Sequence, residues 1–264
     1  MKIMCINCQN NKINKHGGIA SDGINNAKAL AQYIINNNYD LVGTQEMSVY
    51  FTDNLKKYLP NFNLPGKYRN DFPIINKIIP KIKEYKENNK IITKYKVLFE
   101  KTIKLPWFPT KFKQLKYSLK RKSLMRRIAS SALVETEYGK IYMINTHLDY
   151  AIKDIQKKQL NKIYKHIYIV SRKYPIILTG DFNLEYDTDI FKKFIEKLEK
   201  LNIRRIEIND KTNGLKHKNK TAIDHIFISN KFDIVNYGVI EDEDLVNMTD
   251  HKPIFVEVTN SSNN

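Results

Sequence analysis

The feature that most constrains this chain is a recurring pair: an apolar, strand-like run and a polar residue at or beside its end. For example, Lys2-Ile3-Met4-Cys5-Ile6 leads into Asn7. Carboxylates and histidines placed at strand ends suit a divalent-metal hydrolase, because the metal takes oxygen ligands and histidine serves charge stabilisation and proton transfer. The residues that stand in this position are Asn7, Glu46, His147, Asp181 with Asn183, Asp224, and Asp250 with His251.

Length and hydropathy indicate what class of protein carries this pattern. The chain has 264 residues, enough for one large domain or two small ones, and 42% of them are hydrophobic. The apolar stretch at the start is short and is soon interrupted by Asn7 and Gln9, which is not the pattern of a signal peptide. No apolar run approaches the ~18 residues of a membrane span. We therefore expect a soluble cytoplasmic protein without a transmembrane segment, and a monomer.

The two cysteines, Cys5 and Cys8, have the spacing of a CxxC motif. In a strand, side chains three positions apart point to opposite faces, so the two thiols are expected to diverge. Two cysteines also cannot complete a tetrahedral zinc site. A structural role is therefore favoured over a redox or zinc role.

The net charge of +17 is concentrated in residues 67–127. This segment holds 19 basic and 4 acidic residues, which accounts for 15 of the 17 net positive charges. Such a patch suits a polyanionic partner, either nucleic acid or an anionic membrane surface. The other interpretation is compositional bias toward Lys, Asn and Ile throughout the chain. The sequence favours neither the polyanionic partner nor the compositional bias.

Hydrophobic periodicity predicts alternating strands and helices without an internal repeat or linker. We expect one domain over 1–258, with a basic variable segment at 67–127 and a frayed tail at 259–264. Either Thr188 or Asp187 is expected to cap a helix. Residues 111–125 read as a basic helix or a loop, and 209–220 as a polar loop. The expected helices are 24–37, 52–58, 152–172 and 188–201, and the expected strands are 2–7, 39–45, 91–99, 102–105, 128–136, 140–146, 175–180, 203–208, 222–228, 233–240 and 253–258.

Six short motifs in a fixed order carry a family resemblance. They are Met1–Asn7, Gly43–Glu46, Asn145–Asp149, Gly180–Asn183, Ile223–Ile226 and Thr249–Pro253. Each is weak alone, but together they span nearly the whole chain. The chain resembles the endonuclease/exonuclease/phosphatase superfamily of metal-dependent phosphoesterases. The resemblance implies an α/β fold, a DNase I-like four-layer sandwich of two mixed β-sheets packed face to face with helices on the outer faces.

The resemblance also implies a cofactor and a role for each strand-end residue. Glu46 would be the main ligand of Mg²⁺, or of Mn²⁺, with Asn7 and Asp250 nearby. Asp181 would orient or deprotonate the attacking water, and Asn183 would hold that aspartate or the phosphate. His147 and His251 would contact phosphate oxygens or assist the leaving group, with Asp224 hydrogen-bonded to His251.

Several of these positions have a second interpretation. Asp181 and Asn183 could form only an Asx-type turn, although strand alternation would aim both the same way. Alternation sends Asp224 and His225 to opposite faces, so Asp224 is expected at the site and His225 in the packing. Arg127 stands where some relatives place a basic residue. Two roles are equally compatible with this position: contact with the substrate phosphate, or a solvated side chain without a function.

The substrate is left open by the sequence. Gln9 stands where exonuclease III-like repair enzymes carry an acid, which disfavours a repair nuclease. Trp107-Phe108 is as suited to a core as to contact with a base. The basic segment favours a nuclease acting on DNA or RNA. The alternative is a phosphohydrolase of phospholipid head groups or small phosphate esters. A non-catalytic scaffold is disfavoured, because no catalytic position is replaced.

Overall fold

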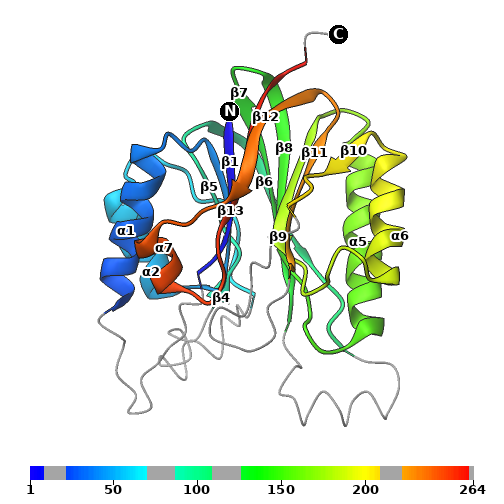
Figure 1. Cartoon of the computed structure of the whole chain (residues 1–264), viewed down its shortest axis with the longest axis horizontal. Coiled ribbons are helices and arrows are strands. Elements are labelled where there is room, and N and C mark those ends of the chain that lie inside the picture. Colours follow the sequence, from blue (N-terminus) through cyan, green and yellow to red (C-terminus); the bar gives the residue numbers. More distant parts are fainter. Residues whose placement is uncertain (9–21, 70–86, 109–125, 209–221, 262–264) are drawn as a thin grey trace.

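Two β-sheets lie face to face between two layers of helices (Figure 1). The computed structural model describes residues 1–8, 22–69, 87–108, 126–208 and 222–261. The five-stranded sheet has the order β12-β13-β1-β2-β5, with β12 at Phe232–Val239, β13 at Ile254–Asn260, β1 at Lys2–Asn7, β2 at Leu41–Gln45 and β5 at Ile91–Thr93. The six-stranded sheet has the order β10-β11-β9-β8-β7-β6, with β10 at Ile203–Arg205, β11 at Asp224–Ser229, β9 at Ile176–Asp181, β8 at Gly139–His147, β7 at Ile128–Thr136 and β6 at Lys96–Lys104.

Both sheets are mixed, which confirms the predicted sandwich. In the five-stranded sheet β1 and β2 are parallel, while β1 pairs with β13 in antiparallel register. In the six-stranded sheet β8 and β9 are parallel and the neighbouring pairs are antiparallel. Since the parallel strands of each sheet end at the same edge, their carboxyl ends bring polar residues together.

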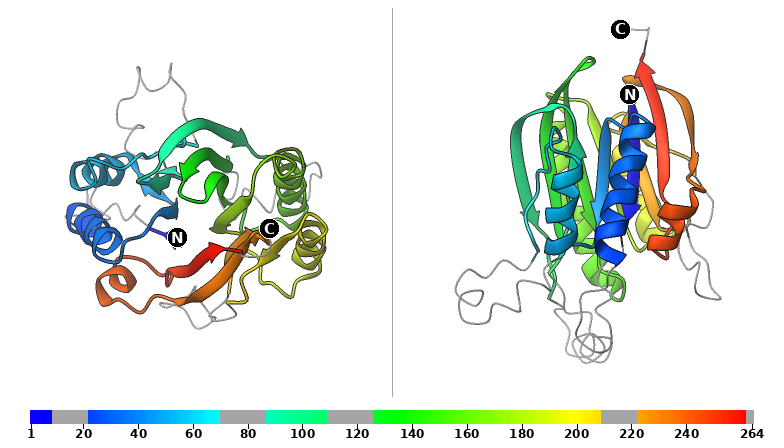
Figure 2. Two further views of the ribbon diagram at one scale, coloured as in Figure 1. Left: turned by 90° about the horizontal axis from the view of Figure 1, so that it is seen from above. Right: turned by 90° about the vertical axis from the view of Figure 1, so that its left-hand side faces the viewer.

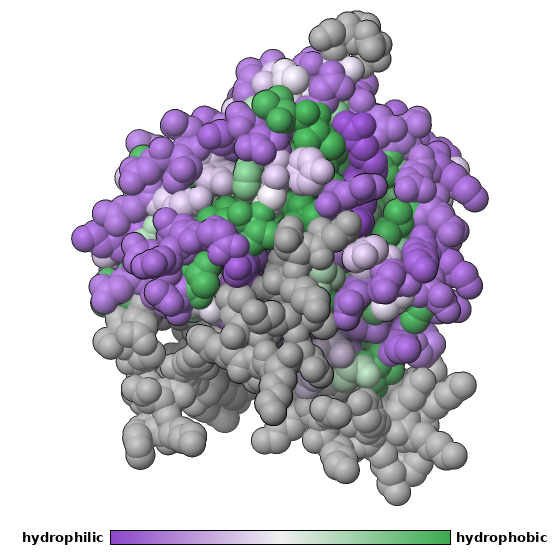
Figure 3. Space-filling view, in the orientation of Figure 1, coloured by the Kyte–Doolittle hydropathy of each residue, from purple (hydrophilic) through white to green (hydrophobic). Residues whose placement is uncertain are grey.

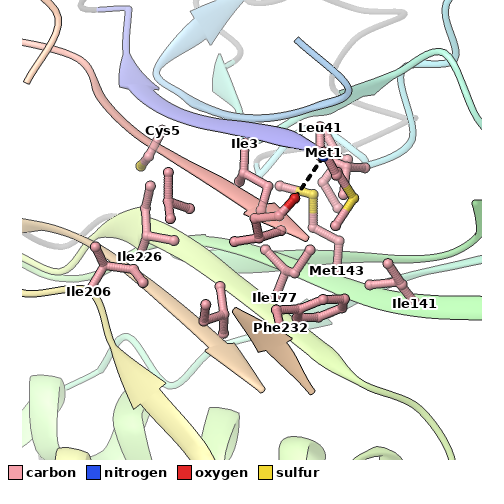
Figure 4. Close-up of a cluster of buried hydrophobic side chains, with 14 of the residues drawn as sticks. Met1, Ile3, Cys5, Leu41, Ile141, Met143, Ile177, Ile206, Ile226 and Phe232 are labelled. Atoms are coloured by element: carbon pink, nitrogen blue, oxygen red, sulfur yellow. Dashed lines mark hydrogen bonds between the residues drawn. The ribbon is translucent and has the colours of Figure 1, made fainter. Parts of the chain in front are cut away.

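Side-chain alternation along the strands divides the core into layers. In β1, Ile3 and Cys5 pack between the two sheets, whereas Met4 and Ile6 pack against the helices of the five-stranded side. Figure 4 shows the inter-sheet layer, in which side chains from both sheets meet. The amino group of Met1 closes this layer by donating to the Val258 carbonyl at 2.8 Å. As predicted, Cys5 and Cys8 diverge into different layers, and both are free and buried.

Amphipathic helices cover the outer faces. In the helix α6, Phe191, Phe194 and Leu198 are buried at the spacing of one helical face. Viewed from above, the helical layers flank the sheets on both sides (Figure 2). Figure 3 shows hydrophilic residues over these helices and hydrophobic residues in the centre of the view. The five-stranded sheet is covered by α1 (Asp22–Asn36), α2 (Val49–Tyr58) and α7 (Glu243–Met248), and the six-stranded sheet by α5 (Lys153–Val170) and α6 (Asp189–Glu199).

The predicted elements are recovered with several corrections. The expected strand 91–99 is divided between β5 in the five-stranded sheet and β6 in the six-stranded sheet, and β6 continues through most of the expected strand 102–105. The tail starts later than predicted, because Thr259 and Asn260 still pair with Asp233 and Phe232. Neither helix α7 nor the short pair β3 (Met47–Ser48) and β4 (Glu87–Asn88) was predicted.

Other expectations concern single caps or fall outside the described residues. Thr188 is the N-cap of α6 but makes no side-chain capping bond, since its hydroxyl donates to the Glu185 carbonyl instead. The segment 111–125 and the loop 209–220 lie outside the described residues. Of the helices that the structure describes, none combines the length and the apolarity required to span a bilayer.

Candidate active site

The carboxyl ends of β1, β2, β8 and β9 and the amino ends of the antiparallel strands β11 and β13 bring the predicted residues to one edge of the sandwich, the lower edge in Figure 1, opposite the two termini. The five-stranded sheet supplies Asn7 at the end of β1, Glu46 after β2, and Asp250 and His251 before β13. The six-stranded sheet supplies His147 at the end of β8, Asp181 at the end of β9 and Asp224 at the start of β11. The register places Asp181 directly beside both His147 and Asp224.

Asp181 is the centre of this group. Its Oδ2 accepts a hydrogen bond from Asn7 Nδ2 at 3.0 Å and lies 3.5 Å from His147 Nε2 and 3.9 Å from His251 Nε2. Burial, reinforced by the charges of Asp224 and Glu46, raises the pKa of Asp181 to about 7, although the nearby His251 acts in the opposite direction. A carboxyl group with such a pKa can both bind and release a proton near neutral pH.

Asn183 reaches Asp181 through its backbone, which corrects the sequence argument. The strand ends at Asp181, and Asn183 adopts a left-handed φ of 50°, so strand alternation no longer applies to it. Its backbone N–H donates to Asp181 Oδ1 at 2.9 Å, which is the Asx-type turn that alternation had disfavoured. Its side-chain amide donates to the Leu148 carbonyl at 3.1 Å. Asn183 therefore holds Asp181 through its backbone, in agreement with one of its two predicted roles.

His251 and Asp224 form the predicted pair. His251 Nδ1 lies 2.8 Å from Asp224 Oδ2, and both side chains are buried. Burial alone would lower the pKa of His251, but the hydrogen-bonded Asp224, helped by Asp181 and Asp250, outweighs burial and raises that pKa to about 10. The ring is therefore an imidazolium at neutral pH, with Nε2 directed at Asp181.

His147, in contrast to His251, is uncharged. Its Nδ1 lies 3.8 Å from Glu46 Oε1. Burial, followed by the positive charges of Arg127 and Arg69, holds the pKa of this imidazole well below its ordinary value. Two neighbouring carboxylates do not offset these effects, because the side chain is only 4% exposed. His147 is thus neutral near pH 7 and can accept or donate a hydrogen bond.

The carboxylates of Glu46 and Asp250 are suited to bind a divalent cation. Glu46 adopts a left-handed φ of 56°, unusual for this residue type, and this turn separates its carboxylate from the buried Met47 that follows. The Glu46 side chain remains 25% exposed and makes no hydrogen bond among the described residues. Asp250 Oδ1 is buried, again without a hydrogen-bond partner in the described part of the chain. Oxygens left in this state suit a hard cation such as Mg²⁺.

A second group of potential ligands exists in Asp181, Asp224 and His251, whose ligand atoms lie within 4.8 Å of one another. This group is less suited to a cation than the first. Asp224 Oδ2 is already hydrogen-bonded to His251, and an imidazolium cannot ligate a metal.

A buried amide bridges the two sheets behind the site and was not predicted as a functional residue. Asn145 Nδ2 donates to the Thr44 carbonyl at 2.8 Å and to the Lys90 carbonyl at 2.9 Å, and its Oδ1 accepts from Gln45 Nε2 at 2.6 Å. A Cβ added at Gly43 would lie 2.7 Å from Asn145 Oδ1, so glycine is needed where the sheets approach. These bonds fix the positions of His147 and Glu46, because His147 lies two residues after Asn145 and Glu46 lies one residue after Gln45.

His225 faces away from the site, as the sequence predicted. Its Nε2 lies 2.9 Å from the Leu184 carbonyl, and its ring packs 4.6 Å from that of Phe191. Burial is the main reason why the pKa of His225 falls to about 4.

Arg127 lines a pocket of about 300 Å³ together with Arg69, Lys67, Lys104 and Arg126. Arg127 is 5% exposed, so the solvated alternative for this residue is wrong. Arg69 was not predicted, because it is one of many basic residues in 67–127 and no local pattern singles it out. Most of that segment falls on 70–86 and 109–125, outside the described residues.

Comparison with known families gives a match over most of the chain. A sequence model described as the endonuclease/exonuclease/phosphatase family matches residues 4–251. A search of curated proteins gave no significant match.

Solved structures with the same fold cover nearly the whole chain. An endonuclease/exonuclease/phosphatase protein from Bacteroides vulgatus has a TM-score of 0.76 at 18% identity, with 98% of each chain covered. A mannosyl-6-phosphatase from Bacteroides thetaiotaomicron has a TM-score of 0.75 at 19% identity, with 98% of this chain and 99% of that chain covered. The human Nocturnin catalytic domain, solved with a bound sulfate anion, has a TM-score of 0.71 at 15% identity, with 99% and 94% covered.

Proposed function

The chain belongs to the endonuclease/exonuclease/phosphatase family of phosphate-ester hydrolases, and from this premise we propose that it is a Mg²⁺-dependent phosphodiesterase that acts on DNA or RNA. The observation that carries the proposal is the convergence on Asp181. A neutral histidine, a cationic histidine and an amide all face its Oδ2 within 3.9 Å. The carboxylate of Glu46 lies beside His147 without a hydrogen bond in the described structure.

Each residue has a role that its surroundings support. Glu46 and Asp250, with Asn7 nearby, would hold the cation, which would neutralise charge on the phosphate oxygens and polarise the phosphorus. Asp181 accepts a proton from the attacking water, since its pKa of about 7 suits a base. Asn7 and the backbone N–H of Asn183 fix the two oxygens of this carboxylate. The His251 imidazolium, held by Asp224, stabilises negative charge on the phosphate, and neutral His147 donates or accepts a hydrogen bond.

Nucleic acid is favoured as the substrate by the basic pocket beside the site, which no acidic residue of the described chain lines. The alternative is a phosphohydrolase of small phosphate esters or phospholipid head groups. It draws support from the structural similarity to a protein named mannosyl-6-phosphatase. Both activities would use the same residues at the reacting phosphate.

A substrate panel tests the proposal. Purified protein is offered single-stranded DNA, duplex DNA, RNA, sphingomyelin and phosphoinositides side by side, with EDTA, Mg²⁺ or Mn²⁺. We expect hydrolysis of a nucleic acid that is lost with EDTA and restored by Mg²⁺ or Mn²⁺. Cleavage of the lipids alone would favour the alternative, and activity that persists in EDTA would refute the metal requirement.

Calorimetry with the Glu46→Gln variant tests the metal site. The variant should lose Mg²⁺ binding while its circular dichroism is retained, because it lacks the main proposed ligand charge. The matched control is Glu199→Gln, which removes the same charge from an exposed position at the end of α6. Unchanged Mg²⁺ affinity in Glu46→Gln would refute the assignment.

A further inference from the structure

We propose that the pocket lined by Lys67, Arg69, Lys104, Arg126 and Arg127 is a subsite for a second phosphate group of the substrate, distinct from the phosphate that is hydrolysed. The inference rests on the proposed function and specifies its substrate class: a compound that carries at least two phosphates. We call this cavity the second-phosphate pocket.

The pocket is built from three segments that are distant in the sequence. It lies between residues 67–69, the end of β6 and the start of β7. The backbone N–H of Lys67 donates to Thr102 Oγ1 at 3.2 Å, which ties the first segment to β6. A Cβ added at Gly66, whose φ is 118°, would lie 2.7 Å from Ser130 Oγ, so this close approach to β7 requires glycine. The walls are therefore set by contacts with two neighbouring strands.

Arg127 is the strongest sign of an anionic ligand. Its side chain is buried, with 5% exposed, and lines the pocket. Its Nε has no hydrogen-bond partner, and its guanidinium makes no ion pair within the described residues. A buried cation is unfavourable unless an anion accompanies it.

The neighbouring Arg69 provides a comparison, because its charge is compensated by an acid. Arg69 forms an ion pair with Glu87, and its side chain is 9% exposed. Arg127 is also buried, and no acid of the described segments forms an ion pair with it. Of these two arginines, the one that lacks a counter-charge in the described structure is thus the one whose charge has the larger effect on His147.

The pocket adjoins the reacting phosphate without being part of its site. None of the proposed catalytic or metal-binding residues lines it. Arg127 and Arg69 are nevertheless close enough to His147 to lower its pKa. The pocket is thus near enough to His147 for one substrate molecule to place a phosphate in each site.

The chemistry of the walls favours phosphate. Five basic side chains line the pocket, and no acid of the described chain does. Guanidinium groups match phosphate oxygens in paired hydrogen bonds. The Arg126 guanidinium lies 5.3 Å from the centre of the Trp107 ring, which also lines the pocket, so part of the wall is held by an aromatic face.

A neighbouring groove favours a nucleic acid strand as the source of this phosphate. Lys104 also lines a cavity of about 410 Å³ over β6 and α5, together with Lys101, Lys162 and Lys165. Among the described residues this groove, too, is lined by no acid. Positive charge therefore continues beyond the second-phosphate pocket, as a chain of phosphates would require.

Two pairs of compounds test the proposal through hydrolysis. The first pair is the p-nitrophenyl ester of thymidine 5′-phosphate with and without a 3′-phosphate, and the second is glucose 1,6-bisphosphate and glucose 6-phosphate. We expect kcat/KM to be about tenfold higher for the two-phosphate member of a pair, mainly through KM, because charge-assisted hydrogen bonds are added. A preference in the nucleotide pair identifies a nucleic acid strand as the source, and one confined to the hexose pair identifies a small bisphosphate. No preference in either pair would overturn the subsite.

The double variant Lys104→Gln/Arg126→Gln locates the effect. It should reduce the ratio of kcat/KM between the two members to about onefold to threefold, since two of the charges are removed. The matched control Lys192→Gln/Lys231→Gln removes the same charge from exposed positions remote from the pocket and should keep the wild-type ratio. An unchanged ratio in the pocket variant would overturn the assignment.

Calorimetry in EDTA separates this inference from the proposed function. Thymidine 3′,5′-bisphosphate and thymidine 5′-phosphate are titrated into wild type, the double variant and Arg127→Met at one salt concentration. Tighter binding of the bisphosphate to wild type alone supports the subsite even if no substrate is hydrolysed. Equal affinities in wild type would overturn it even if the protein proves to be a nuclease.

Discussion

Two histidines lie near the same carboxylate oxygen, yet one is neutral and the other is cationic. His147 Nε2 lies 3.5 Å and His251 Nε2 lies 3.9 Å from Asp181 Oδ2. Both rings are buried. The acidic side of the site, with Asp224 and Asp250, keeps His251 protonated, whereas the basic side, with Arg69 and Arg127, adds to burial in keeping His147 neutral.

This difference arises because burial lowers the pKa of both rings, and the charges nearby then act in opposite directions. For His251 the hydrogen-bonded Asp224 outweighs burial, whereas for His147 the nearby arginines add to it. Asp181 is common to both rings and cannot distinguish them. Asp224 comes from the six-stranded sheet and His251 from the five-stranded sheet, so the pair forms only when the sheets pack. A single site thus offers a cationic and a neutral imidazole at the same pH.

The largest effect should follow from replacing Asp181 or His251. Asp181→Asn and His251→Ala should each lower kcat by at least ~100-fold, because base activation and charge stabilisation each contribute about that much. Steady-state kinetics with saturating Mg²⁺ measure this, and circular dichroism checks the fold. Losses below tenfold for His251→Ala would break the comparison, since the imidazolium would then do little.

The pH dependence of stability should report the charge of His251. Its pKa is raised above the unfolded value of about 6.5, so the stabilisation by Asp224 is complete below that pH and is lost as the pH rises through about 10. The free energy of unfolding should therefore differ most between wild type and Asp224→Asn near pH 6, and the gap should narrow by pH 10. Urea unfolding in EDTA at several pH values measures the gap. A gap that stays constant would mean that His251 is neutral.

A third histidine sharpens the comparison, because burial is the main reason why it is neutral, with a smaller contribution from Arg205. His225 hydrogen-bonds Leu184 and packs on Phe191, away from the site. His225→Ala should lower the free energy of unfolding by roughly 2–4 kcal/mol, as for other large-to-small core substitutions. The kcat of the folded variant should stay within a few-fold of wild type. A loss of turnover comparable to that of His251→Ala would show that β11 faces the other way.

The smallest effect should be on the basic side. Arg127→Met should raise the pKa of His147, because one of the three nearby positive charges, those of Arg127, Arg69 and His251, is removed. The pKa should nevertheless remain below the ordinary value, since burial is the larger cause. NMR titration of the imidazole in EDTA follows this change. Recovery of the ordinary value in the variant would assign the neutrality of His147 to the arginines instead.

The sequence predicts the part of the site that strands determine. A strand fixes the direction of each side chain, so Asp181, Asp224 and His147 could be assigned to the site and His225 to the packing from alternation and motif order. The two-sheet fold followed from the resemblance carried by the same motifs.

Residues beyond the strands could not be predicted in this way. Asn183 takes a left-handed conformation, so alternation misplaced its side chain. Arg69 and Arg127 are 58 positions apart in the sequence, and only the packing of residues 67–69 beside β7 brings them to one pocket. Helix α7 spans six residues, too few for hydrophobic periodicity, although its N-cap Asp242 gave a local signal.

The bridge made by Asn145 between the two sheets has a consequence for inactivation by heat. The carboxylates and histidines are shared between both sheets, and the amide that joins them is fully buried behind the site. Neither half retains a working set of residues once the sheets separate. Loss of activity on heating should therefore coincide with the cooperative melting of the whole sandwich, with no partly melted form that still turns over substrate.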